Sequence, residues 1–119
     1  MQQKQNEIKL EQNGAVTILN IRGDLTAFSE QSLSEAYEEA TAQGSSKLLL
    51  KFDQDAYINS GGIAILIQIL AQTRKNSQAI VITGISDHFK KIFHMVGITK
   101  FAGIHDGLEN ALESLNTGS

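Results

Sequence analysis

Hydrophobic and polar residues alternate along residues 15–22, and this period of two predicts a β-strand. Residues 7–12 form a second candidate strand, and the pair Asn13-Gly14 lies between the two segments. This pair is typical of a two-residue hairpin turn, because such turns need positive φ angles that Asn and Gly tolerate. Apolar side chains fall on both faces of residues 15–22, so we expect this strand to be covered on both sides.

Two stretches show the spacing of apolar side chains that predicts amphipathic helices. The first runs from about Ser29 to Gln43, with Ser29 as the expected N-cap and Gly44 just beyond the helix end. The second begins after Ser86, which is a good N-cap residue, and is closed by Gly97. Both stretches are therefore expected to be helices with recognisable first and last residues.

A last helix is predicted near the C-terminus. Asp106 and Glu109 have the spacing of a capping box, and apolar residues at helical spacing follow them. Short apolar runs separate the predicted helices and indicate buried strands. These runs are residues 47–53, 79–83 and 101–104.

Residues 60–76 are ambiguous, because isoleucines at every second position from 63 to 69 fit a strand as well as a wholly buried helix. Three observations favour a helix. The polar residues Gln68, Gln72 and Lys75 follow helical spacing, the segment is long, and it joins two predicted strands. We therefore expect a buried helix in this segment.

The predicted elements follow the order β β α β α β α β α. This order indicates an α/β fold, in which a mixed, largely parallel sheet with an N-terminal antiparallel hairpin packs against about four helices. A chain of 119 residues fits one domain. We expect residues 1–119 to form that single domain, with residues 1–6 and 116–119 frayed.

Composition narrows the classes of function. The chain has no cysteine, which excludes disulfides and thiolate metal sites. Ten Lys and Arg against thirteen Asp and Glu give a net charge of −3 without a basic block, so nucleic acid is not an expected partner. The first ten residues lack the apolar core of a signal peptide, and the longest apolar run is shorter than the ~20 residues of a membrane span. We expect a soluble, cytoplasmic protein that is not inserted in a membrane.

Ser60 lies at the predicted turn between a strand and a helix, where some hydrolases carry their nucleophile. The nucleophile elbow has a glycine two residues before the serine, and Ile58 stands there in this chain. Gly61 and Gly62 are not followed by the Lys-Ser/Thr ending of a phosphate-binding loop. We expect neither cofactor nor metal, because the spacing of the histidines indicates no catalytic base and no metal site. These histidines are His88, His94 and His105.

The same position suits a helix cap. Ser60 is the expected N-cap of the 60–76 helix, with its hydroxyl accepting a backbone N–H. A phosphate on Ser60 would add about −1.5 to −2 charges beside free N–H groups and the positive end of the helix dipole. Gly61 and Gly62 would leave the serine uncovered by side chains. The fold could therefore tolerate phosphorylation, and a binding partner would meet a changed surface.

Several segments match the motifs of one known family. Residues 57–63, YINSGGI, match a turn of two apolar residues followed by Asp-Ser-Ser/Thr-Gly-Leu/Ile. Residues 22–26 are similar to a Gly-x-Leu-Asp loop, the apolar residues 80–84 follow as a strand, and residues 96–101 resemble a Gly-Leu-x-x-x-Phe ending. Through these motifs the chain resembles the STAS domain family, which includes bacterial anti-sigma-factor antagonists and cytoplasmic domains of sulfate transporters. The resemblance covers nearly the whole chain.

The resemblance implies a phosphorylation switch with Ser60 as the phosphoacceptor and no enzymatic activity. In such systems the unphosphorylated antagonist binds an anti-sigma factor, which is a serine kinase related to histidine-kinase ATPase domains, and frees the sigma factor. Phosphorylation abolishes this binding, and a metal-dependent phosphatase restores it. The residues expected to contact the partner are Asp24, Thr26, Tyr57, Asn59, Ser60, Gly61, Gly62 and Ile63.

Three residues depart from the family pattern. Asn59 and Thr26 each replace an aspartate, and Gly61 replaces a second hydroxyl residue, so Ser60 is the one hydroxyl left in the turn. The resemblance also leaves a second function open, that of a small STAS subunit in a membrane lipid-transport ABC complex. A hydrolase that uses Ser60 is a third alternative, which the missing elbow glycine argues against.

Overall fold

The structure alternates strands and helices after an initial hairpin, as predicted. It is a computed structural model and describes residues 7–117. The strands are β1 (Glu7–Asn13), β2 (Val16–Arg22), β3 (Lys47–Phe52), β4 (Ala79–Thr83) and β5 (Gly103–His105). The α-helices are α1 (Glu30–Ala42), α2 (Ser60–Lys75), α3 (Asp87–Met95) and α4 (Leu108–Thr117), and the short 3-10 helices are η1 (Ala27–Ser29) and η2 (Ile98–Lys100).

These strands form one sheet in the order β1-β2-β3-β4-β5. β1 pairs antiparallel with β2, and every later pair is parallel. The predicted α/β fold with a mixed, largely parallel sheet and an N-terminal hairpin is confirmed. Because β2, β3 and β4 are parallel, the loops that follow them all leave the sheet at the same edge.

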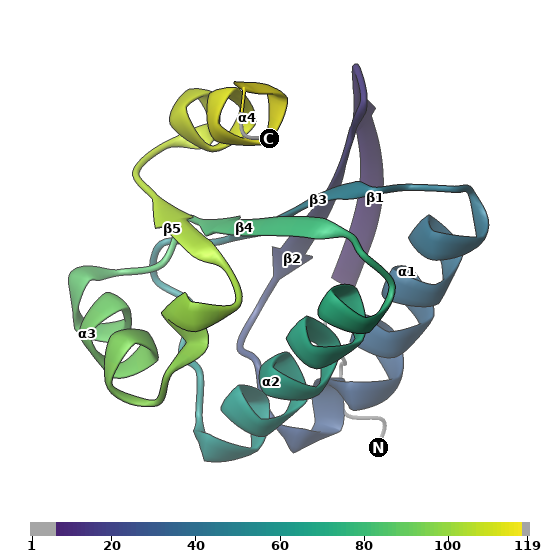
Figure 1. Ribbon diagram of the computed structural model, residues 1–119. Coiled ribbons are helices and arrows are strands. Elements are labelled where there is room, and N and C mark those ends of the chain that lie inside the picture. The colour runs from purple at the N-terminus through teal and green to yellow at the C-terminus, as the bar shows by residue number, and fades with distance from the viewer. Residues whose placement is uncertain (1–6, 118–119) are drawn as a thin grey trace.

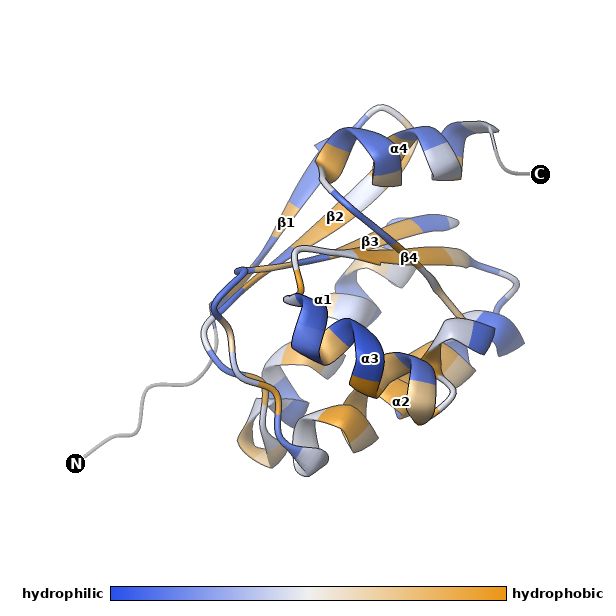
Figure 2. Ribbon diagram, turned by 90° about the vertical axis from the view of Figure 1, so that its left-hand side faces the viewer, coloured by the Kyte–Doolittle hydropathy of each residue, from blue (hydrophilic) through white to orange (hydrophobic). Residues whose placement is uncertain are grey.

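Helices cover both faces of the sheet, but unequally. α1, α2 and α3 lie on one face and α4 lies alone on the other (Figure 1). Strands β2, β3 and β4 carry mostly hydrophobic residues between these two layers (Figure 2). The larger core includes Leu19, Leu33, Leu50, Leu66, Ile82 and Phe93. The smaller core, under α4, consists of Val16, Ile18, Leu49, Val81, Ala111 and Leu115.

Residues 60–75 are helical, so the prediction for the ambiguous segment is confirmed. Ile65 and Ile69 are buried together with Leu66 and Leu70, at the spacing of one helix face. The isoleucines at positions 63 and 67 lie at the margin of the same face and are half-buried. The period of two in the isoleucines therefore reflects a wide apolar helix face and not a strand.

The hairpin turn is one residue later than predicted. Asn13 pairs with Val16 as the last residue of β1, so Gly14 and Ala15 form the turn. Gly14 has a φ of 59° and Ala15 has no positive φ. A single glycine in the left-handed region is enough for this turn, which is why Asn13 is free to continue the strand.

Two predicted helix caps do not form the expected side-chain bonds, although Ser29 does occupy the N-cap position of α1. Ser29 precedes α1, but its hydroxyl makes no bond to the first turn of that helix. It accepts the N–H of Thr26 instead, at 3.0 Å. The carboxylate of Asp106 contacts Lys90, and α4 begins two residues later at Leu108 without the predicted capping box. For Ser29 a local bond within the preceding turn determines where the side chain points, and for Asp106 the tertiary contact with Lys90 does so.

Both ends of the chain were predicted to fray, at residues 1–6 and 116–119. Residues 116 and 117 were expected to fray and are the last residues of α4. Residues 1–6 and 118–119, also expected to fray, lie outside the described residues. The last strand, expected at 101–104, is shorter and begins at Gly103, because residues 98–100 form the turn η2.

Candidate functional site

The loops that follow β2 and β3 are joined by backbone hydrogen bonds. The N–H of Leu25 donates to the carbonyl of Tyr57 at 2.9 Å, and the N–H of Asn59 donates to the carbonyl of Leu25 at 3.1 Å. Leu25 and Ile58 form an isolated parallel bridge. Asp24 Oδ1 accepts a further bond from the N–H of Tyr57 at 2.9 Å. The two segments that match family motifs therefore form one structural unit.

The two glycines after Ser60 allow α2 to approach the loop that follows β2. A Cβ on Gly62 would lie 2.3 Å from the carbonyl oxygen of Leu25. A Cβ on Gly61 would lie 2.9 Å from the backbone nitrogen of Ala27. Both glycines are thus required by close backbone packing. The sequence predicted only that they leave Ser60 uncovered by side chains and did not reveal this packing role.

Asn59, and not Ser60, is the N-cap of α2. Its backbone is extended, with φ −95° and ψ −178°, and its Oδ1 accepts the N–H of Gly62 at 2.9 Å. The prediction that Ser60 caps this helix is wrong. Asn and Ser are about equally good N-caps, so the local sequence could not distinguish them. An aspartate at position 59 could make the same bond, which is why the family's aspartate and this asparagine are equivalent in capping.

Ser60 is the first residue of α2, and its side chain is exposed. Its hydroxyl makes no hydrogen bond to any residue in the range 7–117. The first N–H groups of a helix have no partner within the helix, and here the cap satisfies the one at Gly62. The N–H groups of Ser60 and Gly61 therefore remain at the positive end of a 16-residue helix, where an added anion is stabilised.

The predicted site residue Thr26 begins the short helix η1. Thr26 Oγ1 accepts the N–H of Phe28 at 3.1 Å, while the N–H of Thr26 donates to the buried hydroxyl of Ser29. These reciprocal bonds form a capping box and hold the turn rigidly. The sequence did not reveal η1, because a turn of three residues has no periodic pattern.

Large apolar side chains are exposed near Ser60. Tyr57 is 58% exposed, and its ring meets that of Phe89 edge-on with centroids 6.0 Å apart. Phe28, in η1, is 76% exposed. Ile63, the last predicted contact residue, is half-buried against the main core. The structure therefore places the predicted residues around the start of α2, with Ile63 turned inward, and adds Phe28 to them.

The geometry does not supply the groups that a serine hydrolase needs. Among residues 7–117 no histidine or carboxylate forms a hydrogen bond with the Ser60 hydroxyl, and no group of three or more His, Asp or Glu side chains could hold a metal ion. His88 and His94 are exposed on α3, six residues apart. No helix in this part of the chain is long and apolar enough to cross a membrane.

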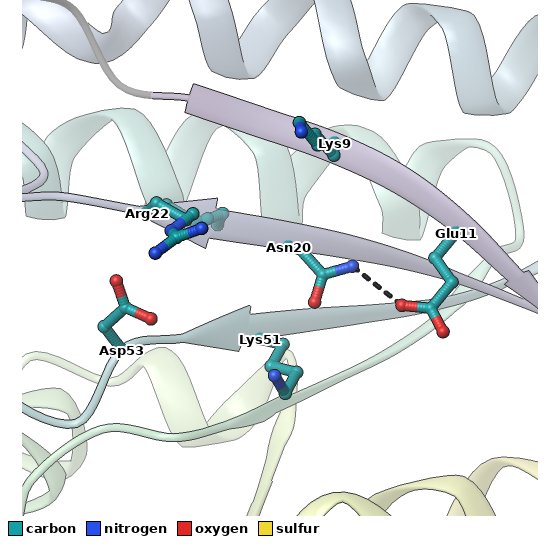
Figure 3. Close-up of a pocket in the computed structure, with 7 residues that line it drawn as sticks. Lys9, Glu11, Asn20, Arg22, Lys51 and Asp53 are labelled. Carbon is teal, nitrogen blue, oxygen red and sulfur yellow. Dashed lines mark hydrogen bonds between the residues drawn. The ribbon is translucent and has the colours of Figure 1, made fainter.

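A second candidate site is a polar hollow of about 270 Å³ (Figure 3). It lies on the same sheet face as α4, over the part of β1, β2 and β3 that this helix does not cover. It contains charges of both signs, and Asn20 donates to Glu11 at 3.0 Å across it. Three basic and two acidic side chains do not define one class of ligand. The lining residues are Lys9, Glu11, Asn20, Ile21, Arg22, Lys51 and Asp53.

Comparisons with known proteins agree with this architecture. The family model described as "Mlab, STAS domain" matches residues 8–109. An anti-sigma-B factor antagonist from Staphylococcus aureus is 20% identical over 91 residues, which are 76% of this chain and 84% of that protein.

Solved structures share the fold at low sequence identity. An anti-sigma factor antagonist from Mycobacterium paratuberculosis has a TM-score of 0.78 and 16% identity, covering 93% of this chain and 94% of that one. The Bacillus cell fate determinant SpoIIAA in its phosphorylated form has a TM-score of 0.65 and 14% identity, covering 90% of this chain and 97% of that one.

Proposed function

The chain belongs to the STAS domain family, and on that premise we propose that it is an anti-sigma-factor antagonist that acts by partner switching. In its unphosphorylated form it binds an anti-sigma factor, which is a serine kinase of the histidine-kinase ATPase fold. Phosphorylation of Ser60 ends this binding, and a metal-dependent serine phosphatase reverses the modification. The protein acts in the cytoplasm as a binding module and not as an enzyme.

The observation that carries this proposal is the division of roles between Asn59 and Ser60. Asn59 caps α2, so the exposed Ser60 hydroxyl can be modified without removing a bond that the fold needs. A phosphate on Ser60 would be stabilised by the helix dipole and the two free N–H groups. The modification would therefore leave the fold intact and change only the surface.

The surface around Ser60 supports the loss of binding on phosphorylation. Tyr57 and Phe28 expose aromatic rings on the two loops that meet at the start of α2. A dianion beside apolar contacts loses its hydration when a partner covers it, and this costs affinity unless the partner supplies cations. The proposed contact residues are Asp24, Thr26, Tyr57, Asn59, Ser60, Gly61, Gly62 and Ile63.

The experiment compares three variants of Ser60 in a binding assay with the anti-sigma factor encoded in the same genome. Ser60→Ala should bind as the wild type does, and Ser60→Asp should lose binding. Ser60→Asn is the matched control, because it has the shape of Asp without the charge, and it should bind. Mass spectrometry of the protein from its native cells should find phosphate on Ser60. Equal binding of Ser60→Asp and Ser60→Asn would refute the switch.

A second function is favoured by the description of the matching family model, which names Mlab as well as the STAS domain. In this case the chain would be a small STAS subunit of a membrane lipid-transport ABC complex. The charge at Ser60 would then not control assembly. Capture of an ABC-transporter ATPase by Ser60→Ala and Ser60→Asp alike would support this role, as would transport genes next to the gene of this protein.

A further inference from the structure

Phe28 is an exposed aromatic residue that the fold does not use. With 76% of its surface accessible, it does not belong to either hydrophobic core. A single exposed apolar residue is normal on a protein surface, and Phe28 is distinguished by the rigidity of its turn and by its place next to the start of α2. Met95, 80% exposed at the end of α3, is comparable in exposure but lies on a different element.

The turn that carries Phe28 is rigid. The capping box between Thr26 and Ser29 fixes both ends of η1, and the side chain of Ser29 is buried beneath it. A rigid turn presents an aromatic ring with little loss of conformational entropy on binding. Residues of this kind, large and held in place before association, are typical of interface hot spots.

The turn is also fixed against the start of α2. Ala27, the neighbour of Phe28, is so close to Gly61 that no Cβ would fit there without a shift. Phe28 therefore directly follows the residue that contacts Gly61. Gly61 is the second residue of α2, and Ser60 is the first. The position of Phe28 relative to Ser60 is set by backbone packing and not by a flexible loop.

We propose that Phe28 is the apolar anchor of the partner surface and inserts into an apolar pocket on the anti-sigma factor. This inference rests on the proposed function and adds a contact that none of the eight predicted residues supplies. With Tyr57 on the other loop, it makes a surface in which aromatic rings on two loops accompany the modifiable hydroxyl. Phe28 provides affinity, and the charge state of Ser60 decides whether that affinity is realised.

The test measures the dissociation constant for the purified anti-sigma factor encoded in the same genome, by titration calorimetry with the full chain. Phe28→Ala should weaken binding by at least about 30-fold, the effect expected of a hot-spot residue. Phe28→Leu should lose less, because it keeps an apolar side chain. Met95→Ala is the matched control and should stay within about twofold of the wild type, since substitutions at exposed positions outside an interface have small effects. Thermal unfolding should be unchanged in all three variants.

A second measurement does not depend on truncating the side chain. A photo-crosslinking phenylalanine analogue at position 28 should form a covalent adduct with the anti-sigma factor, and the same analogue at position 95 should not. Wild-type affinity of Phe28→Ala, in a protein whose Ser60→Asp variant still loses binding, overturns the role of Phe28 and leaves the switch in place. A wild-type chain that does not bind the anti-sigma factor overturns both.

Discussion

The first turns of α2 and α3 have a serine in different positions. Both helices follow a parallel strand and leave the same edge of the sheet. In α3 the serine is the cap itself, and Ser86 Oγ accepts the N–H of Phe89 at 3.4 Å. In α2 the cap is Asn59, and Ser60 follows it with a hydroxyl that makes no bond to residues 7–117. A serine can serve as a switch when a neighbouring residue makes the bond that stabilises the helix.

The two helices also differ in how their second and third residues pack. In α3 these residues are His88, which is exposed, and Phe89, which is buried in the core. In α2 they are Gly61 and Gly62, which touch the backbone of residues 25–27. The start of α2 is therefore positioned by backbone contacts, and the start of α3 by a side chain.

The largest loss of stability is expected from Gly62→Ala, which tests this difference in packing. The added methyl group would lie 2.3 Å from the carbonyl oxygen of Leu25 and would force the two loops apart. We expect a loss of about 3 kcal/mol or more in the free energy of unfolding, measured with urea. His88→Ala, at the second residue of α3, is the control and should change this free energy by less than about 0.5 kcal/mol. Equal stability of Gly62→Ala and the wild type would contradict the close approach.

A smaller effect is expected when the caps are removed. Asn59→Ala should cost about 1 kcal/mol of unfolding free energy, because the N–H of Gly62 loses its acceptor. Ser86→Ala should cost somewhat less, since its bond is longer. Ser60→Ala should leave the free energy unchanged within about 0.5 kcal/mol. A loss in Ser60→Ala as large as that in Asn59→Ala would show that Ser60 is a cap after all.

A negative charge at the first residue of α2 should stabilise the protein slightly. Ser60→Asp should raise the unfolding free energy by about 0.3 to 0.5 kcal/mol at low salt, through the helix dipole. The gain should vanish in ~1 M salt, where charges are screened within about 3 Å. Ser60→Asn should show no such salt dependence. A destabilised Ser60→Asp would mean that the site does not tolerate an anion.

The smallest loss of stability is expected when the ion pair between Lys90 of α3 and Asp106 is removed. Lys90 contacts the carboxylates of Asp106 and Asp87, whereas the first turn of α2 has no acidic residue. The hydrogen bond between Lys90 and Asp106 raises the pKa of the lysine above its ordinary value of 10.5 and lowers the pKa of Asp106 below its ordinary value of 3.8. Its contribution to stability should thus be fully present between these two ordinary values.

The directions of these two pKa shifts determine how the stability provided by the ion pair depends on pH. The contribution should be lost as the pH falls through the folded-state pKa of Asp106, and again as it rises through that of Lys90. Asp106→Asn should therefore lower the urea midpoint slightly at pH 7 and leave it unchanged in strong acid. The loss should be small because both groups are exposed. A deficit in Asp106→Asn that grows on acidification would contradict this assignment.

Much of the fold could be predicted because the patterns act over long segments. Helix α2 was identified by its length and polar spacing although its isoleucines suited a strand. The turn of the hairpin was misplaced by one residue, because Asn13 and Gly14 both accept the required backbone geometry and cross-strand pairing decides between them. The predicted capping bonds of Ser29 and Asp106 do not form because each side chain has another partner, Thr26 in the turn before α1 and Lys90 on α3.

The site was predicted as a set of residues but not as a geometry. The motif resemblance placed residues 24–26 and 57–63 together, and hydrogen bonds join Asp24 and Leu25 to Tyr57 and Asn59. The choice of Asn59 over Ser60 as the cap depends on where α2 begins, and the contact of Gly61 and Gly62 with the loop after β2 fixes this. Phe28 was missed, since nothing in a single sequence distinguishes an exposed phenylalanine from a core one.

The position of α4 has a consequence for the order of folding during synthesis. The strands lie in the sheet in chain order, so each new strand leaves the ribosome beside a neighbour that has already been made. Among residues 7–117, the apolar face formed by Val16, Ile18, Leu49 and Val81 is covered by α4, which follows all five strands in the sequence. Until residues 108–115 emerge, this face is exposed to water and can attract other unfinished chains. The synthesis of α4 therefore ends the period in which this apolar face can promote aggregation of the nascent chain.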